Sequence, residues 1–179
     1  MKQTEKTKER IAGACLELLN ATPLEALRTQ DILEKASVSR SSFYRHFPDK
    51  FEVANWIYRR QVEKAVHGMP ALRNWKEWTV AEHDYIRRHK RFFRNIAGYR
   101  GQNSFEEYLC RYFTDNVMKF RRNRGEEMTE EQRYAVRRFS LIAARSTVEW
   151  ILNDFQPDDA TLIRLNEACI PPCIRPFYE

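Results

Sequence analysis

The residues best suited to chemistry lie in one short basic segment near the N-terminus. The segment combines hydroxyl, guanidinium and ammonium donors, which are Ser39, Arg40, Ser41, Ser42, Tyr44, Arg45 and Lys50. Donors of these kinds bind phosphate oxygens and base edges, so the segment has the chemistry of a DNA-reading surface. The same composition is common on a solvated helix with a basic face, and the residues alone leave that interpretation open.

Two short helices are predicted to present this segment. Thr29 is predicted to cap the first helix, which runs to about Ala36. Residues 37–39 interrupt the helical pattern, and Ser39 is predicted to cap the second helix, Arg40–Phe47, which a proline then stops. Two helices joined by a three-residue turn are typical of a helix-turn-helix.

The composition limits both the fold and the partner. Of the 179 residues 31% are charged, and only 5 are Gly and 7 are Pro, which favours helices over turn-rich sheets. Lys and Arg number 31 against 25 for Asp and Glu, and the net charge of +6 favours a polyanionic partner such as nucleic acid. We therefore expect an all-α protein with almost no strand.

Capping signals and helix breakers divide the rest of the chain. Asp49–Glu52, Ser104–Glu107 and Thr129–Gln132 each fit a capping box, in which the first side chain accepts from the backbone and the last reaches back. The helices expected outside the DNA-reading segment are Thr4–Asn20, Asp49 to about His67, Trp75–His89, Phe92–Ala97, Ser104 to about Arg124, Thr129 to shortly before Pro157, and Asp158–Cys169.

The segment Thr29–Lys50, which reads TQDILEKASVSRSSFYRHFPDK, resembles the DNA-binding signature of the TetR family of regulators. The resemblance implies a helix-turn-helix DNA-binding domain over residues 1–50 and a ligand-binding and dimerisation domain over residues 51–179. In fold terms, a three-helix head is joined by a long fourth helix to a C-terminal helical bundle. One departure is Ser37, where the family usually has glycine. A non-glycine residue there is expected to adopt a left-handed backbone at a cost of about 1 kcal/mol.

The resemblance also assigns roles to particular residues. It implies that Arg40, Ser41, Ser42, Tyr44 and His46 face DNA and that Lys50 touches a phosphate. The full DNA-binding set is then Thr29, Ser39, Arg40, Ser41, Ser42, Tyr44, Arg45, His46 and Lys50. Family members act as homodimers on palindromic double-stranded operators, and we expect the same partners here.

Two further segments, Asn55–Tyr58 and Gly101–Phe105, are similar to a subgroup that includes dihydroxyacetone-kinase operon regulators. The function expected from the resemblance is a sequence-specific transcriptional regulator, a repressor under the control of an unknown small-molecule effector. Members of the subgroup need not be repressors, so the sign of regulation stays open.

A ligand pocket in the C-terminal domain needs apolar walls and a few convergent polar groups. The aromatic candidates are Trp75, Trp78, Phe93, Tyr108 and Tyr112, and the polar candidates are His83, Gln102, Asn103 and Arg111. An aromatic stripe is more often plain core, and the sequence does not show which face of each helix these residues occupy.

The predicted helix before Pro157 carries two apolar stripes. One stripe contains Phe139, Ile142, Ala143, Thr147, Trp150 and Ile151, and the other contains Leu141, Val148, Leu152 and Phe155. One stripe can serve the core and the other a symmetry-related partner. Small residues would let the partner helix approach closely, and they are Ala143, Ala144, Ser146 and Thr147. Leu162, Leu165 and Cys169 of the last helix are expected to extend that surface. The alternative is a helix fully buried within one monomer.

Other classes of function find little support. The four histidines form no HxxxH or ExxH metal arrangement, and there is no phosphate-binding glycine loop or nucleophile elbow, so we expect no enzyme, catalytic residue, metal or cofactor. A helical-bundle enzyme is one alternative and a sequence-independent nucleic-acid-binding protein is another, the latter disfavoured by the short recognition helix. Cys15, Cys110, Cys169 and Cys173 are expected to be reduced thiols, with a redox pair of the last two as the alternative. No segment approaches the ~20 apolar residues of a membrane span, and we expect a cytoplasmic protein.

Overall fold

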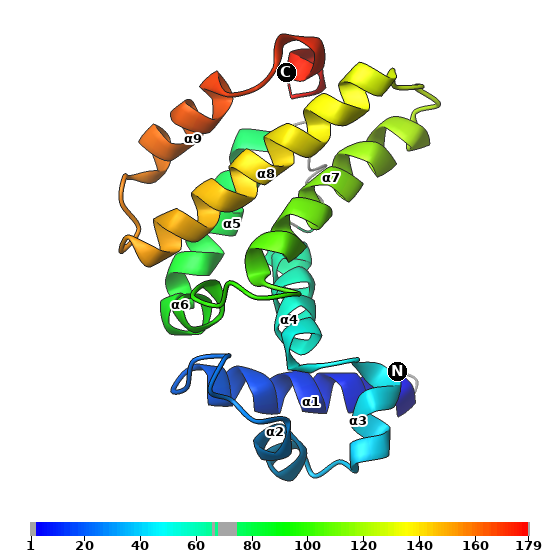
Figure 1. The fold of residues 1–179 in the computed structure, drawn as a ribbon, viewed down its shortest axis with the longest axis vertical. Coiled ribbons are helices and arrows are strands. Elements are labelled where there is room, and N and C mark those ends of the chain that lie inside the picture. The colour runs from blue at the N-terminus through cyan, green and yellow to red at the C-terminus, as the bar shows by residue number, and fades with distance from the viewer. Residues whose placement is uncertain (1–2, 66, 68–74, 179) are drawn as a thin grey trace.

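The computed structural model describes residues 3–65, 67 and 75–178, and within these ranges it contains helices and loops but no strand. In chain order the elements are α1 (Gln3–Leu19), α2 (Thr29–Ala36), α3 (Arg40–His46), α4 (Lys50–Ala65), α5 (Trp75–Arg88), α6 (Lys90–Ala97), α7 (Phe105–Asn123), α8 (Glu130–Leu152), α9 (Asp159–Ala168) and the 3₁₀ helix η1 (Pro172–Phe177). The first three form a small head, and α4 leads from it into a larger body of α5 to η1 (Figure 1). The all-α prediction, with a three-helix head and a helical body, is confirmed.

The head is built on the amphipathic helix α1. Its inner face buries Ile11, Cys15 and Leu19 completely, and their i, i+4, i+8 spacing keeps the three on one side of the helix. Ile32 of α2 and Phe43 of α3 are equally buried and belong to the same apolar cluster. Because this cluster continues through α4 and α6 into α8 and α9, the head and the body share one hydrophobic core.

Apart from Thr29, the predicted cap side chains accept from the backbone as expected. Of the three predicted boxes, both bonds are found at Thr129–Gln132, whereas Glu107 accepts from the N–H of Asn103 (2.9 Å) rather than of Ser104. The Oγ of Ser39 accepts from the backbone N–H of Ser42 (3.1 Å), and the Oδ1 of Asp49 accepts from that of Glu52 (2.7 Å). Thr129 and Gln132 form the reciprocal box, with distances of 3.1 and 3.0 Å. These side chains satisfy backbone donors that have no partner within the helix.

The start of α2 differs from the prediction. Thr29 is the first helical residue, and Arg28 precedes the helix as its cap position. The backbone N–H of Arg28 donates to Asp31 Oδ2 (3.1 Å), and its guanidinium donates to Asp31 Oδ1 (2.7 Å). The prediction that Thr29 caps the helix is wrong, because the carboxylate of Asp31 supports the residue before Thr29.

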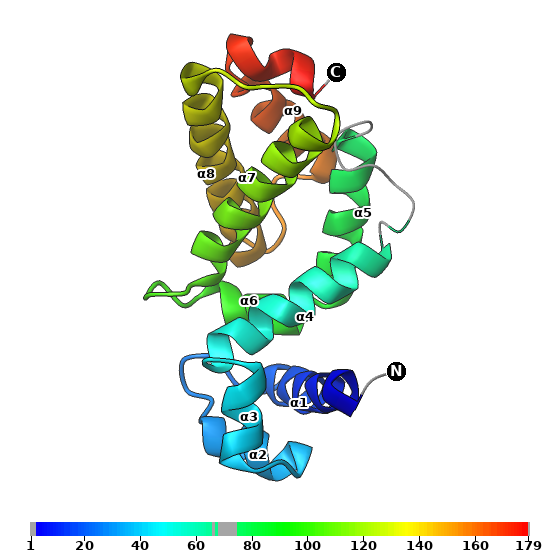
Figure 2. The ribbon, with the colours of Figure 1, turned by 90° about the vertical axis from the view of Figure 1, so that its right-hand side faces the viewer.

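The body is organised around α7 and α8, which lie side by side and run in opposite directions (Figures 1 and 2). Helices α5 and α6 pack beneath them, α9 covers α5 and α8, and η1 packs on α8. A second, smaller apolar cluster, which includes Val136, Ile174 and Phe177, closes the end of the body farthest from the head. None of the helices in the described part of the chain is both long and apolar enough to cross a bilayer.

Helix α8 has one buried and one exposed face, but their composition differs from the predicted stripes. Val148 and Phe155 lie in the core, and so does Leu162 of α9, so these three cannot meet a partner as predicted. Ile142 is exposed, although most of the stripe that contains it is buried. The large apolar side chains exposed on α8 and α9 are Tyr134, Leu141, Ile142, Leu152 and Leu165.

Candidate nucleic-acid interface and cavity

The outer face of α3 carries most of the predicted DNA-binding residues. Ser39, Arg40, Ser41, Tyr44 and Arg45 are exposed. Helix α3 lies at the end of the molecule opposite η1 (Figure 2). Tyr44 is 45% exposed, so its ring and hydroxyl are both accessible to a partner. The guanidinium of Arg40 lies 5.7 Å from its ring centre, so the two side chains present one combined basic and aromatic surface.

Three other members of the predicted set are less exposed. Ser42 and His46 are half-buried on the flanks of α3, and Thr29 is half-buried at the start of α2. Each keeps part of its side chain at the surface.

Aromatic packing fixes the orientation of α3. Phe43 and Phe47 are buried on its inner face, and the ring of Phe47 lies 6.0 Å from that of Trp56 in an edge-to-face arrangement. Because Trp56 belongs to α4, this contact joins the C-terminal end of α3 to the helix that leads into the body. The exposed donors of α3 are therefore held by the helix that connects the head to the body.

The turn between α2 and α3 contains the predicted left-handed residue. Ser37 has φ 50° and ψ 51°, and its N–H closes the end of α2 by donating to the carbonyl of Glu34. The guanidinium of Arg10 in α1 also donates to the carbonyls of Ala36 and Ser37, each at 2.7 Å. These two hydrogen bonds attach the turn to α1. Sequence analysis missed Arg10 because its partners are distant in the chain.

Lys50 has a structural role that the sequence did not indicate. Its ammonium donates to the carbonyl of Glu25 (2.9 Å) and to that of Leu27 (2.5 Å), in the loop between α1 and α2. Since an ammonium has three donors, one remains for a phosphate. Lys50 thus ties the start of α4 to the loop that leads into α2, whatever it contacts on DNA.

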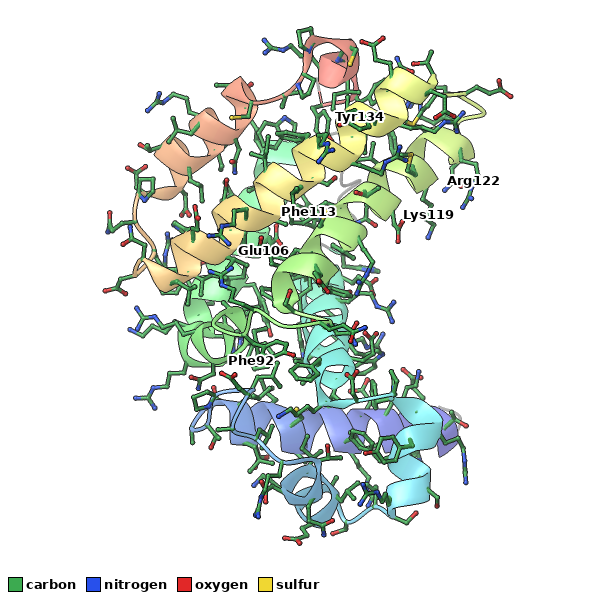
Figure 3. The ribbon with its side chains drawn as sticks, in the orientation of Figure 1. Phe92, Glu106, Phe113, Lys119, Arg122 and Tyr134 are labelled. Atoms are coloured by element: carbon green, nitrogen blue, oxygen red, sulfur yellow. The ribbon has the colours of Figure 1, made fainter. Side chains whose placement is uncertain are left out.

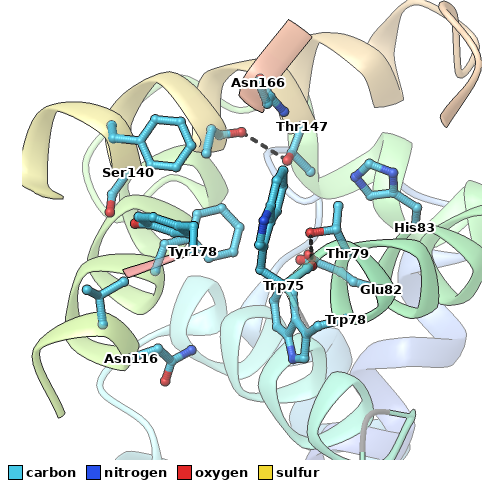
Figure 4. A pocket seen from close by; sticks show the side chains of 14 residues that line it. Trp75, Trp78, Thr79, Glu82, His83, Asn116, Ser140, Thr147, Asn166 and Tyr178 are labelled. Atoms are coloured by element: carbon cyan, nitrogen blue, oxygen red, sulfur yellow. Dashed lines mark hydrogen bonds between the residues drawn. The ribbon is translucent and has the colours of Figure 1, made fainter. Parts of the chain in front are cut away.

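The body contains a cavity of about 90 Å³ between α5, α7, α8 and η1 (Figure 4). Its aromatic walls are Trp75, Trp78, Phe113, Phe139 and Tyr178. Its polar lining consists of Thr79, Glu82, His83, Asn116, Ser140, Thr147 and Asn166. In Figure 4 the ring of Trp75 stands in the middle, with Ser140 and Tyr178 on one side and Glu82 and His83 on the other.

Glu82 is the most unusual residue of this lining. It is 2% exposed and accepts a hydrogen bond from the hydroxyl of Tyr58, which belongs to α4. Burial raises the pKa of Glu82 to about 8, and the hydrogen bond from Tyr58 opposes that shift. The carboxyl group of Glu82 thus joins the cavity to α4.

His83, beside it, links α5 to α9. The ring is buried, stacks on Trp150 at 4.4 Å and donates through Nδ1 to Asp159 Oδ1 (3.1 Å). Arg87 donates to the other oxygen of Asp159 (2.8 Å). The hydrogen bond from His83 lowers the pKa of Asp159 to about 2, with a further contribution from Arg87. Asp159 is therefore ionised at neutral pH and forms an ion pair with Arg87.

Three of the nine predicted ligand residues, Trp75, Trp78 and His83, line the cavity. The other six lie elsewhere: Phe93 and Tyr108 are buried against Tyr58, Tyr112 stacks on Trp78, Gln102 and Arg111 are exposed, and Asn103 lies in the loop before α7. The prediction for those six does not hold for this cavity, because the sequence could not show which face of each helix points inward.

Glu82 and Ser140 were missed, although a signal existed for the first. Trp78, Glu82 and Ile86 are spaced i, i+4, i+8, which places Glu82 on the buried stripe of α5. An acidic residue on such a stripe indicates either a structural partner or a binding site.

The head and the body also meet at α6 and at the loop before α7. The side chain of Asn95 donates to the carbonyl of Leu19 (2.8 Å), and its own carbonyl accepts from the N–H of Leu24 (2.9 Å). The amide of Asn103 donates to Asp49 Oδ2 (3.1 Å) at the start of α4. The end of α1 is therefore attached to α6, and the start of α4 is attached to the body.

Comparisons with known proteins agree with this arrangement. The family described as "Bacterial regulatory proteins, tetR family" matches residues 11–55, and the family described as "Transcriptional regulator C-terminal region" matches residues 73–169. The HTH-type dhaKLM operon transcriptional activator DhaS of Lactococcus lactis subsp. lactis is 22% identical over 96 residues, 54% of this chain and 51% of that protein. The chain thus matches about half the length of that relative.

Solved structures share the fold over nearly the whole chain. The dihydroxyacetone kinase operon activator DhaS superposes with a TM-score of 0.58 at 18% identity, covering 92% of this chain and 96% of that one. A TetR transcriptional regulator from Rhodococcus sp. RHA1 gives a TM-score of 0.62 at 15% identity, covering 92% and 94%. At these identities the likeness establishes the fold alone.

Proposed function

This chain belongs to the TetR family of bacterial regulatory proteins, and we propose that it acts as a homodimer whose affinity for a palindromic operator is set by a small effector molecule. It is a DNA-binding transcriptional regulator, and the matched relatives are regulators rather than enzymes. Its place of action is the cytoplasm, where the bacterial chromosome lies. The exposed donor face of α3, with Arg40, Ser41, Tyr44 and Arg45, is the observation that carries the DNA-binding proposal. Ser42 and His46 would flank this contact, and Thr29 and Lys50 would reach the phosphate backbone.

The test is a selection of bound sequences from random double-stranded DNA, followed by anisotropy titration of the recovered site. We expect a palindrome whose half-sites are about one helical turn apart. Arg45→Ala should weaken binding by about tenfold or more. Arg122→Ala removes the same group from the exposed end of α7 (Figure 3) and should leave affinity unchanged. Equal losses in the two variants, or no palindrome, would overturn the assignment of α3.

The exposed apolar face of α8 and α9 supports the homodimer. Leu141, Ile142 and Leu152 on α8 and Leu165 on α9 are each 41–48% exposed, and Tyr134 projects from the same helix (Figure 3). Single exposed apolar residues are ordinary, but several on adjacent helices mark an interaction surface. A two-fold dimer through this face would hold two heads apart for half-sites separated by about 34–36 Å.

Sedimentation at micromolar concentration tests the dimer. Wild type should sediment at twice the monomer mass of 21.5 kDa, and the double variant Leu141→Glu/Leu152→Glu should sediment as a monomer. Val80→Glu places the same charge at an exposed apolar position on α5 and should remain dimeric. A monomeric wild type, or a dimeric double variant, would contradict the proposed face.

The cavity supports control by an effector, because one of its lining residues is bonded to α4, the helix that leads to the head. Glu82 connects the lining to α4 through Tyr58, and α6, which follows α5, binds the end of α1 through Asn95. A ligand that favours one placement of α4 over another would change operator affinity by tenfold for about 1.4 kcal/mol of difference. A thermal-shift screen of metabolites, followed by operator titration, tests this coupling. A ligand that fills the cavity and leaves operator affinity unchanged would refute it for that ligand.

The proposed sign of regulation is repression, through a dimer that occupies a promoter. Activation is the second candidate, because the two relatives named DhaS are activators. A promoter–reporter fusion carrying the selected operator separates the two: deleting the gene raises expression under repression and lowers it under activation.

A further inference from the structure

We propose that the cavity takes a small organic cation with an aromatic body, and that the carboxylate of Glu82 recognises its positive charge. This inference names the chemical class of the effector proposed above and rests on that proposal for its biological meaning. The charge balance of the cavity, its aromatic walls and the free acceptor positions of Glu82 each contribute to the inference.

The charge balance comes first. Among the described residues that line the cavity there is one acidic side chain, Glu82, and there is neither a Lys nor an Arg. The guanidinium of Arg87, on the next turn of α5, is bonded to Asp159. A buried carboxylate without a cation is costly to ionise, and burial accordingly raises the pKa of Glu82 to about 8. A cationic ligand would supply the missing counter-charge, whereas an anionic ligand would meet no cation.

The walls are suited to the same ligand. Rings of Trp75, Trp78, Phe113, Phe139 and Tyr178 surround the space. Aromatic faces attract cations through their quadrupole, tryptophan most strongly, and they also pack against an aromatic ligand. The volume of about 90 Å³ is several times the ~10–15 Å³ that one water needs, yet small for a pocket, so only a small ligand can occupy it.

The acceptor atoms near Glu82 are available to a donor. One carboxylate oxygen accepts from Tyr58, and a carboxylate offers about four lone-pair positions in all. Thr79, three residues earlier on the same face of α5, already donates its hydroxyl proton to the carbonyl of Trp75 (2.8 Å), which leaves its oxygen as an acceptor. Ser140 is 2% exposed and its Oγ has no hydrogen-bond partner among the described residues, so a ligand that passes Trp75 would gain a second polar contact.

Three probes of nearly one shape and different charge provide the test. Benzamidinium is a cation, benzamide is neutral and benzoate is an anion, and all three share one ring with one planar substituent. Isothermal titration calorimetry on the full-length protein without DNA measures each. Because a charge-assisted pair exceeds a neutral hydrogen bond, we expect benzamidinium to bind about ten- to a hundredfold more tightly than benzamide, and benzoate to bind weakest.

Two variants test whether the preference for benzamidinium over benzamide comes from the charge of Glu82. In Glu82→Gln the ratio of benzamidinium to benzamide affinity should fall to within about threefold, because an amide keeps the shape and loses the charge. Glu77→Gln removes an exposed acid from the same helix and should keep the wild-type ratio. Since Glu82 must lose its proton to pair with a cation, the wild-type affinity for benzamidinium should also rise about tenfold per pH unit between pH 6 and 8, while that for benzamide stays level.

The titratable groups around Glu82 are Tyr58 on α4, Tyr108 and Tyr112 on α7, His83 on α5 with its partner Asp159 on α9, and Tyr178 on η1. The pKa values of all four tyrosines are raised by burial, so none of them titrates in this range. Loss of the pH dependence in Glu82→Gln therefore separates Glu82 from His83.

Benzamide binding as tightly as benzamidinium, a cation preference that survives in Glu82→Gln, or no binding of benzamidinium at millimolar concentration would each overturn the proposal. The calorimetry uses no DNA, so its result is independent of the operator assays. A protein that prefers benzamidinium but selects no DNA palindrome would refute the proposed function and leave the ligand class standing.

Discussion

Glu82 should make the protein less stable as the pH rises, and Glu82→Gln should remove that dependence. The pKa of Glu82 is about 8 in the folded protein, against an ordinary value of 4.5. The folded state therefore holds this proton more tightly than the unfolded chain does. The unfolding free energy therefore falls as the pH rises between these two pKa values. A carboxylate in a salt bridge has the opposite effect, because its folded-state pKa is lowered.

The magnitude follows from the size of the shift. Each pH unit well inside the interval costs about 1.4 kcal/mol, so between pH 5 and pH 7 this residue alone should lower the unfolding free energy by about 2–3 kcal/mol. In the folded state at pH 5 a protonated Glu82 and the amide of Glu82→Gln are both neutral, so the difference in unfolding free energy between the two proteins at pH 5 serves as the reference. Between pH 5 and pH 7 that difference should shift in favour of the variant by about that amount.

Urea denaturation at one fixed protein concentration measures this difference, since a dimer's stability depends on concentration. Subtracting the unfolding free energy of the variant from that of wild type at each pH removes the contributions of histidines and exposed acids, which the two proteins share. For Glu77→Gln, which changes an exposed acid on α5, the unfolding free energy should depend on pH in the same way as that of wild type. If Glu82→Gln also runs parallel to wild type from pH 5 to pH 8, Glu82 is ionised in the folded protein and the reasoning about its burial is wrong.

Three other changes have definite expected outcomes. Ser37→Gly should raise the unfolding free energy by about 1 kcal/mol, because φ is 50° there, and a thermal-shift assay would show it as a higher Tm. Lys50→Met should lower it by about 1–3 kcal/mol in urea denaturation, because two loop carbonyls lose their donor; an unchanged midpoint would mean that water replaces the ammonium. Tyr58→Phe removes the hydrogen bond that lowers the pKa of Glu82, so the pH-dependent loss of stability should extend to higher pH than in wild type, and an unmoved profile would contradict that bond.

Local features of the head were predictable because their causes are local. Ser39 as a cap, the break at residues 37–39 and the left-handed backbone of Ser37 all depend on neighbours a few residues away, and the structure has them as expected. Arg10 and Lys50 were not predictable in the same way. Their partners, the end of α2 and the loop before it, lie more than twenty residues away in the chain, so only the packing of α1 and α4 brings them together.

The cavity was harder to predict than the head because it depends on which face of each body helix points inward. Three of the candidates, Trp75, Trp78 and His83, line the cavity from α5, whereas Gln102 and Arg111 are exposed to solvent. Aromatic content alone cannot separate a cavity wall from ordinary core, since Phe93 and Tyr108 pack directly against Tyr58. Glu82 was the informative residue, because its charge conflicts with the buried stripe on which it lies.

The presence of a buried acid at this position is itself an argument for a role in switching. A neutral residue of the same shape would make the fold more stable at neutral pH, so burial of Glu82 costs free energy that the fold alone does not require. The Tyr58–Glu82 bond lies between the cavity and α4, and a hydrogen bond to an ionised carboxylate is about twice as strong as one to a neutral acid. A cation that ionises Glu82 would therefore tighten the contact between α5 and α4. Because α4 holds α3 through Trp56 and Phe47, that change in the body would reach the DNA-reading helix without any ligand contact in the head.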